Sequence, residues 1–168
     1  MSTSGHPCIV HYRDIQDPDK ARYEGSDELL SIGSPFGRHF GLKKLGIHHE
    51  LVPPGRRTSW PHAESAEEEF IYVIEGSPQA WINGELYQLE PGDGVGFPSG
   101  TGVAHTFINN SHTDVRLLVV GEAAKDENRI YYPLHPERNA LMAERDYLWE
   151  DPPAQEMGHH DGLPEAQR

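Results

Sequence analysis

Short apolar runs separated by Gly and Pro fill the middle of this chain, and they restrict its fold more than any other feature. Between Gly37 and Glu122 the runs include KLGIHHELV, EEFIYVIEG, ELYQL and VRLLVVGE, with turn sequences such as PPG and PGDG between them. Spacing of this kind is typical of an antiparallel sandwich or barrel rather than of βαβ units. The sequence therefore predicts an all-β fold.

Local signals divide the chain around this all-β region. Asn83-Gly84 supplies the two positive φ angles of a type I′ hairpin turn between QAWI and ELYQL. Pro136 stands at the first position of a short predicted helix, PERNALMAERDYLW, whose Leu148 and Trp149 we expect to pack on the barrel. We expect a single domain: an extension with a possible edge strand, CIVHY (1–36), a β-barrel (37–133), and the helix with its tail (134–168).

The tail after this helix has too little apolar area to offset the ordering of its backbone. We expect residues 151–168 to form a mobile tail or to lie along the surface.

Charge and composition restrict the partners. The formal net charge of -13 would repel a phosphate backbone or an anionic membrane, so we expect a small-molecule ligand, no nucleic acid and no membrane. The first residues, MSTSGHPCIV, lack the pattern of a secretory leader. The single cysteine, Cys8, cannot form an intramolecular disulfide, which favours a cytoplasmic location.

The stretch WPHAESAEEEFIYVIEG places carboxylates in front of a strand. Glu69 shares a strand face with Ile71 and Val73, and an inward carboxylate there would need a cation or a hydrogen-bond donor. Glu64 could converge with Glu69 only if the chain bends between them. Both faces of the strand after Glu69 are apolar, which favours a place inside a sandwich or a dimer contact, and we expect a homodimer.

Two stretches resemble the paired motifs of the cupin superfamily. PPGRRTSWPHAESAEEEFIYVIEG resembles the first motif: His62 stands at its first histidine, Glu64 at its second, Glu69 at its glutamate and Gly76 at its closing glycine. GDGVGFPSGTGVAHTFIN resembles the second motif and is filled by Gly92, Pro98, Gly100, His105 and Asn109, with two extra residues between Gly100 and His105. Together with the strands around them the motifs cover about half the chain, and FPSGTGVAHTFINNS in particular resembles small bacterial single-domain cupins.

The resemblance implies a single-domain jelly-roll (cupin) β-barrel that binds a divalent metal at its centre. The family's ligand positions are occupied here by His62, Glu64, Glu69 and His105. Three of them hold ligand types usual for the family, and these suit zinc, iron, manganese or nickel. Glu64 replaces a histidine, so it is either a harder, anionic ligand, a catalytic general base, or part of a metal-free pocket.

Other residues have weaker claims on the site. His48 or His49 could line the pocket, although surface exposure or core hydrogen bonding is favoured for them. Arg56 or Arg57 could hold a carboxylate substrate, although an ordinary surface loop is favoured. Asn109 suits a turn better than a metal, because an amide oxygen is a weak ligand for transition metals.

The resulting hypothesis is a divalent-metal-dependent enzyme acting on a small carboxylate, carbonyl or sugar-like substrate, in which Glu64 moves protons. Dioxygenase, isomerase, decarboxylase and lyase chemistry all occur on similar cupins, and the fold does not choose among them. The alternative is a non-catalytic cupin that binds a small molecule without a functional metal site.

Overall fold

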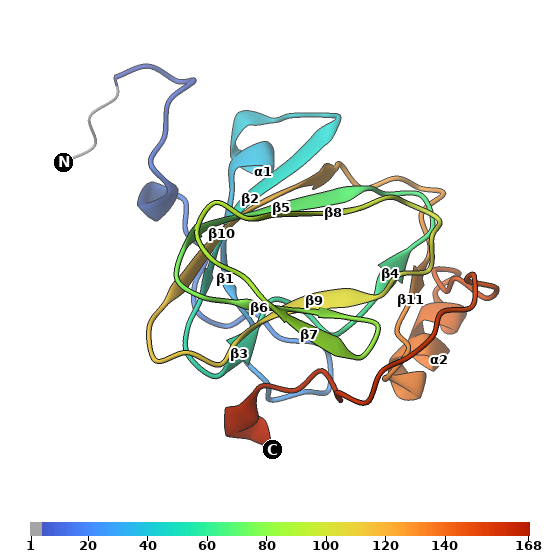
Figure 1. The fold of residues 1–168 in the computed structure, drawn as a ribbon. Coiled ribbons are helices and arrows are strands. Elements are labelled where there is room, and N and C mark those ends of the chain that lie inside the picture. The colour runs from blue at the N-terminus through green and yellow to red at the C-terminus, as the bar shows by residue number, and fades with distance from the viewer. Residues whose placement is uncertain (1–4) are drawn as a thin grey trace.

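Two antiparallel sheets face each other in the computed structural model, which describes residues 5–168 (Figure 1). The first has the order β1-β2-β10-β5-β8 and the second the order β3-β9-β6-β7, while β11 and β4 form a separate pair. The first sheet consists of β1 (Ile32–Pro35), β2 (Leu45–Val52), β10 (Val115–Glu122), β5 (Glu69–Glu75) and β8 (Gly94–Phe97). The others are β3 (Arg56–Arg57), β9 (His105–Asn109), β6 (Gln79–Ile82), β7 (Glu85–Gln88), β11 (Ile130–Tyr131) and β4 (Ala63–Glu64). The jelly-roll prediction is confirmed.

Helices are short and lie outside the sheets (Figure 1). They are η1 (Tyr12–Asp14), α1 (Phe36–Phe40), α2 (Pro136–Glu144) and η2 (Glu165–Gln167). The predicted C-terminal helix is confirmed as α2, with Pro136 at its first turn. No helix among the described residues is long and apolar enough to cross a membrane.

The N-terminal region differs from the prediction in detail. CIVHY forms no strand, and the edge strand of this region is β1, which pairs with β2. The first sheet therefore begins before Gly37, inside the region assigned to the extension. The first four residues of that extension lie outside the described part of the chain.

The main core lies between the sheets. Alternate residues of the facing strands point inward, so one cluster collects Val52, Ile71, Val73, Ala80, Phe97, Phe107, Val115 and Leu117. A second cluster surrounds Trp81, which is completely buried, and includes Ala63, Ala104 and Ile108 with Trp149 packed against it. The packing of Leu148 and Trp149 on the body of the protein agrees with the prediction.

The β6–β7 hairpin has the predicted turn. Asn83 and Gly84 have φ angles of 47° and 88°, so both adopt the left-handed conformation that a type I′ turn requires. The same turn binds the tail, because Gly158 N donates to Asn83 O and His160 N donates to Gly84 O. This arrangement is the second of the two expected for residues 151–168: the tail lies along the surface.

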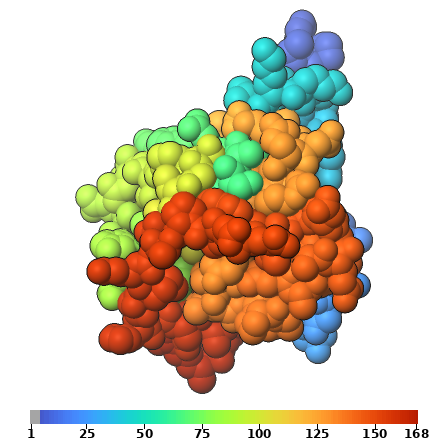
Figure 2. Space-filling view, turned by 90° about the vertical axis from the view of Figure 1, so that its right-hand side faces the viewer, coloured from blue at the N-terminus to red at the C-terminus, as the bar shows by residue number. Residues whose placement is uncertain are grey.

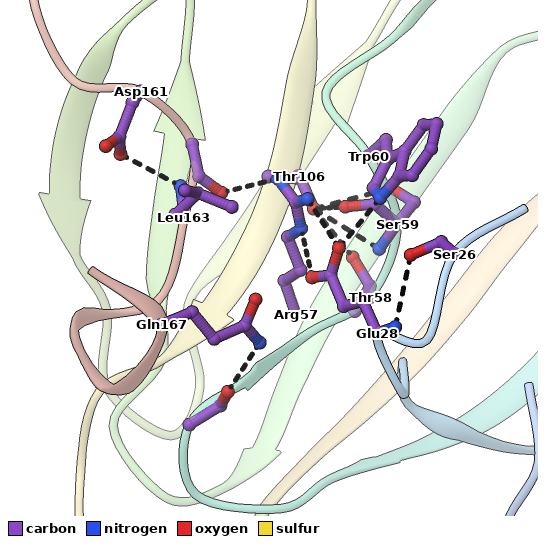
Figure 3. Close-up of polar contacts among 12 residues, drawn as sticks. Ser26, Glu28, Arg57, Thr58, Ser59, Trp60, Thr106, Asp161, Leu163 and Gln167 are labelled. Carbon is purple, nitrogen blue, oxygen red and sulfur yellow. Dashed lines mark hydrogen bonds and ion pairs between the residues drawn. The ribbon is translucent and has the colours of Figure 1, made fainter. Parts of the chain in front are cut away.

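The tail is fixed by several further hydrogen bonds and crosses the molecule in Figure 2. Trp81 Nε1 donates to His160 O, and Arg57 Nη1 donates to Gly162 O. Arg57 also pairs with Glu28 of the N-terminal region, so residues distant in sequence meet in one buried polar cluster (Figure 3). The tail thus covers the second core cluster.

The outer face of β5 is open. Phe70, Tyr72 and Ile74 are 45%, 40% and 45% exposed, whereas Ile71 and Val73 on the opposite face are buried. The strand is therefore covered on one side only within a single chain.

Candidate active site

A cavity of about 130 Å³ lies between the two sheets. Three of the four residues at family ligand positions, His62, Glu69 and His105, stand in its wall. The remaining lining residues are Ser31, Glu50, Thr58, Ser59, Ile71, Phe107 and Val119. The cavity therefore combines hydroxyl, imidazole and carboxyl groups with an apolar floor.

The backbone explains how residues so distant in sequence converge. Glu69 begins β5 and alternates inward with Ile71, after residues 65–68 break the chain between β4 and β5. The sequence allowed Glu64 to converge with Glu69 only if the chain bends between them; the strand is interrupted there, but only Glu69 lines the cavity. His62 and His105 are joined by an antiparallel bridge, with hydrogen bonds of 3.2 and 3.0 Å between their backbones.

His105 and Glu69 bind each other. His105 Nε2 and Glu69 Oε2 are 2.7 Å apart, and the imidazole ring stacks on Phe97 with ring centroids 3.6 Å apart. Burial raises the pKa of Glu69, but the hydrogen bond and the charge of His105, with the nearby His62, outweigh it, so the net pKa lies below the ordinary value. Glu69 is consequently a carboxylate at neutral pH.

His62 is held as a neutral imidazole. Its Nδ1 lies 2.8 Å from Trp60 O, and a carbonyl oxygen only accepts, so Nδ1 carries the proton and Nε2 keeps a lone pair. Burial, reinforced by repulsion from His105, lowers the pKa of His62 to about 4. The ring can therefore accept a proton or bind an electrophile through Nε2.

Glu64 does not line this cavity. Its backbone pairs with Ile130 of β11, and its side chain is absent from the residues that line the cavity. Burial, followed by the charges of Glu67 and Glu69, raises the pKa of Glu64 to about 7. The structure therefore separates Glu64 from the three residues with which the motif groups it, and its catalytic role stays a prediction.

Glu50 is a second carboxyl group in the cavity that the motifs do not identify. It lies on the inner face of β2, where it pairs with Leu117 of β10. Burial, followed by the charges of Glu69 and Asp17, raises its pKa to about 7, although a hydrogen bond from Ser31 opposes the shift. Its even spacing from the buried Val52 was the only sequence signal for an inward position.

The donor types suit a divalent metal, but their arrangement fits only in part. His62 has the hydrogen bond on its second nitrogen that orients a metal-bound imidazole, whereas His105 Nδ1 is buried without a partner. His105 Nε2 and Glu69 Oε2, which could each bind a metal, are hydrogen-bonded to each other. Within residues 5–168 no three His, Cys, Asp or Glu side chains are arranged as a metal-binding group. A divalent ion would have to replace the proton between His105 and Glu69.

The remaining candidate residues have structural partners. Arg57 pairs with Glu28, and Arg56 pairs with Asp19 at 2.6 Å. His49 stacks on Tyr12 outside the cavity.

Asn109 and His48 also fall outside the cavity lining. Asn109 donates to the carbonyl groups of Val52 and Thr113, which agrees with the turn role expected for it. His48 Nδ1 lies 3.8 Å from Glu50 Oε1, near the site but not in the cavity wall.

A wider surface groove of about 390 Å³ shares Glu69 and Phe97 with this region. Its other lining residues are apolar residues, glycines and two glutamates: Leu45, Phe70, Pro98, Val120, Gly96, Gly121, Glu68 and Glu122. A ligand with an apolar part could therefore lie next to the cavity.

Comparison with known proteins places the chain in a family. The model of the Cupin domain matches residues 48–121. The polyketide synthase CurC of Streptomyces cyaneus is 30% identical over 114 residues, which are 67% of this chain and 67% of that protein.

Two solved structures are also similar. A sugar phosphate isomerase of the cupin superfamily from Silicibacter pomeroyi is 27% identical with a TM-score of 0.58, covering 61% of this chain and 64% of that one. A putative sugar phosphate isomerase from Acidithiobacillus ferrooxidans is 26% identical with a TM-score of 0.62, covering 76% and 81%. This chain thus spans slightly less than two thirds of the Silicibacter structure. The two motifs, the two facing sheets and these matches together show that the chain belongs to the cupin superfamily.

Proposed function

We propose that this cupin is a metal-assisted enzyme that moves a proton at the carbon next to the carbonyl of an uncharged small molecule. The observation that carries the proposal is the cavity itself, which holds a neutral imidazole, His62, and the carboxyl groups of Glu50 and Glu69. Among these groups Glu50, whose pKa is raised to about 7, is suited to proton transfer, because an acid or base that titrates near neutral pH can both take up and release a proton.

The similar proteins support this class of reaction without fixing it. Isomerisation of a sugar phosphate requires a proton to leave a carbon beside a carbonyl, and polyketide chains carry acidic protons between their carbonyl groups. Substrates of the kinds named for CurC and for the two isomerases would therefore both suit a group that moves such a proton. Of the reactions expected from the sequence, isomerase or lyase chemistry fits it best.

Electrostatics favour an uncharged substrate over a phosphorylated one. Neither lysine nor arginine is among the residues that line the cavity, and two of its walls carry carboxyl groups. Phosphate groups are usually held by arginine, lysine or a helix N-terminus. The nearest arginines of the motif region, Arg56 and Arg57, are already paired with Asp19 and Glu28.

His62, Glu69 and His105 are the residues that would hold a divalent ion, whereas Glu64, the fourth ligand position expected from the sequence, does not line the cavity. A bound ion supplies Lewis acidity, which stabilises negative charge on a carbonyl oxygen. The chain itself supplies an apolar wall of Ile71, Phe107 and Val119, and Trp60 O fixes the tautomer of the neutral His62.

The test uses protein purified without an affinity tag. Metal content, measured by mass spectrometry after incubation with zinc, manganese, iron and nickel, should fall in His62→Ala and His105→Ala. Proton exchange is followed by NMR in D₂O with dihydroxyacetone and dihydroxyacetone phosphate, which differ only in the phosphate. We expect faster exchange of the uncharged ketone. If neither ketone exchanges and the metal content is unchanged in the variants, the proposed enzyme is refuted and the alternative, a non-catalytic small-molecule-binding cupin, remains.

We also propose that two copies of the chain pair through the outer face of β5. Phe70, Tyr72 and Ile74 form an exposed apolar row on this strand, and such rows are unfavourable in water. Light scattering after gel filtration should report a dimer for the wild type and a monomer for Tyr72→Lys. A monomeric wild type would refute the pairing without affecting the cavity.

A further inference from the structure

Glu50 occupies a core position of the first sheet. On β2 it pairs with Gly33 of β1 and with Leu117 of β10, and Leu117 is completely buried. Its side chain is only 16% exposed. Carboxyl groups are rare at such positions unless they are paired or functional.

No strong cation compensates this carboxyl group. Within the described chain its only ion-pair partner is His48, whose Nδ1 is 3.8 Å from Oε1. The other charged or titratable groups that act on it are Glu69 from β5 and Asp17 from the N-terminal region, and both are acidic. Burial and these charges raise the pKa of Glu50 to about 7, so both of its protonation states are accessible near neutral pH.

The carboxyl group of Glu50 packs against the backbone of β1. A Cβ atom at Gly33 would lie 3.2 Å from Glu50 Oε1, so the carboxyl group lies in the space that a side chain at position 33 would need. Ser31, one strand away, supplies a hydrogen bond and also lines the cavity. The carboxyl group is therefore held at the cavity by close packing and by a neutral hydrogen-bond partner.

We propose that Glu50, rather than the motif residue Glu64, is the residue that carries the proton in this cavity. The carboxylate of Glu50 takes the proton from the carbon next to the substrate carbonyl, and the C–H electron pair moves to the carbonyl oxygen as an enolate. The resulting carboxylic acid then returns the proton to a carbon of the product. This inference rests on the proposed function, because it assigns a group to that reaction.

Three isosteric variants test the assignment. Glu50→Gln should slow the deuterium exchange of dihydroxyacetone about 10²–10⁴-fold, the usual contribution of general acid–base catalysis. Glu64→Gln is the competing variant and should have a smaller effect. Glu75→Gln, at the far end of β5 with a 67% exposed side chain, is the control for a mere loss of charge.

Two further readouts separate proton transfer from a structural or metal-binding role. Metal content should be the same in wild type and Glu50→Gln. The pH dependence of exchange between pH 5 and 9, which in the wild type should follow a group that titrates near 7, should be absent from the variant.

Stability supplies a check on the fold of the variant. The pKa of Glu50 is higher in the folded than in the unfolded protein, so its contribution to stability declines as the pH rises from about 4.5 to about 7. Glu50→Gln should therefore be at least as stable as the wild type at pH 8.

Exchange at the wild-type rate in a folded Glu50→Gln, a larger loss in Glu64→Gln, or loss of metal from Glu50→Gln would overturn the assignment. Absence of exchange in the wild type with both ketones would instead overturn the proposed function itself.

Discussion

Arg57→Met should lower the free energy of unfolding by about 3–5 kcal/mol, because it leaves a buried carboxylate without its cation. The side chains of Arg57 and Glu28 are 1% and 11% exposed. Two guanidinium nitrogens donate to the two oxygens of Glu28, each at 2.7 Å, and a third donates to Gly162 O (Figure 3). Methionine preserves most of the aliphatic volume but donates no hydrogen bond.

A remaining hydrogen bond to Glu28 reduces the loss of unfolding free energy. Trp60 Nε1 donates to Glu28 at 2.8 Å, so the carboxylate keeps one hydrogen bond in the variant. Burial raises the pKa of Glu28, but the hydrogen bond and charge of Arg57 outweigh it and keep the net pKa below 4.5. A lowered pKa stabilises the fold above pH 4.5, and this stabilisation is lost as the pH falls through the folded-state value. The difference between wild type and Arg57→Met should therefore shrink in acid.

Urea unfolding followed by tryptophan fluorescence at pH 7 measures the effect. Arg56→Met is the matched control, because its partner Asp19 is 47% exposed and such pairs contribute about 1 kcal/mol or less. Glu28→Gln combined with Arg57→Met should be more stable than Arg57→Met alone, since glutamine can still accept from Trp60 and carries no buried charge. Equal costs for the two arginine variants, or strictly additive costs in the double variant, would refute this reasoning.

Three other perturbations have defined outcomes. Removal of residues 151–168 should shift tryptophan emission to longer wavelength and lower the urea midpoint, because the tail covers the buried Trp81; an unchanged spectrum would contradict this cover. Gly84→Ala should cost about 1–2 kcal/mol in unfolding free energy, since its φ is 88° and a Cβ would lie 2.6 Å from Gly158 N; a midpoint equal to wild type would show that the turn tolerates a side chain. Asn109→Ala should cost about 1–3 kcal/mol in thermal or urea unfolding because two backbone carbonyls lose their donor, and a smaller loss would mean that water replaces the amide.

Features fixed by local chemistry were predictable from the sequence. The Asn83-Gly84 turn follows from the φ angles that these residues tolerate, and the start of α2 follows from Pro136. The convergence of His62 and Glu69 in one cavity followed from the spacing of the family motif. Each of these features depends on nearby residues or on a spacing that the family shares.

Features that depend on distant partners were not predictable. The face on which Glu50 lies is decided by the pairing of β2 with β1 and β10, and the run around it is mixed in character. The tail has little apolar area, but its order comes from backbone hydrogen bonds to the β6–β7 turn, which composition does not reveal. Glu64 occupies a motif position, yet it pairs with Ile130 of β11 and does not line the cavity.

The buried polar cluster and the cavity share one short segment of chain. Arg57 fixes the start of this segment through Glu28 and Gly162, Thr58 and Ser59 line the cavity, and Trp60 O holds Nδ1 of His62. The indole of the same Trp60 donates to Glu28. Disruption of the Arg57 cluster would therefore disturb Trp60, the residue whose carbonyl oxygen holds His62. The tail, by binding Arg57, therefore supports the tautomer of the histidine on which the proposed chemistry depends, although it does not line the cavity.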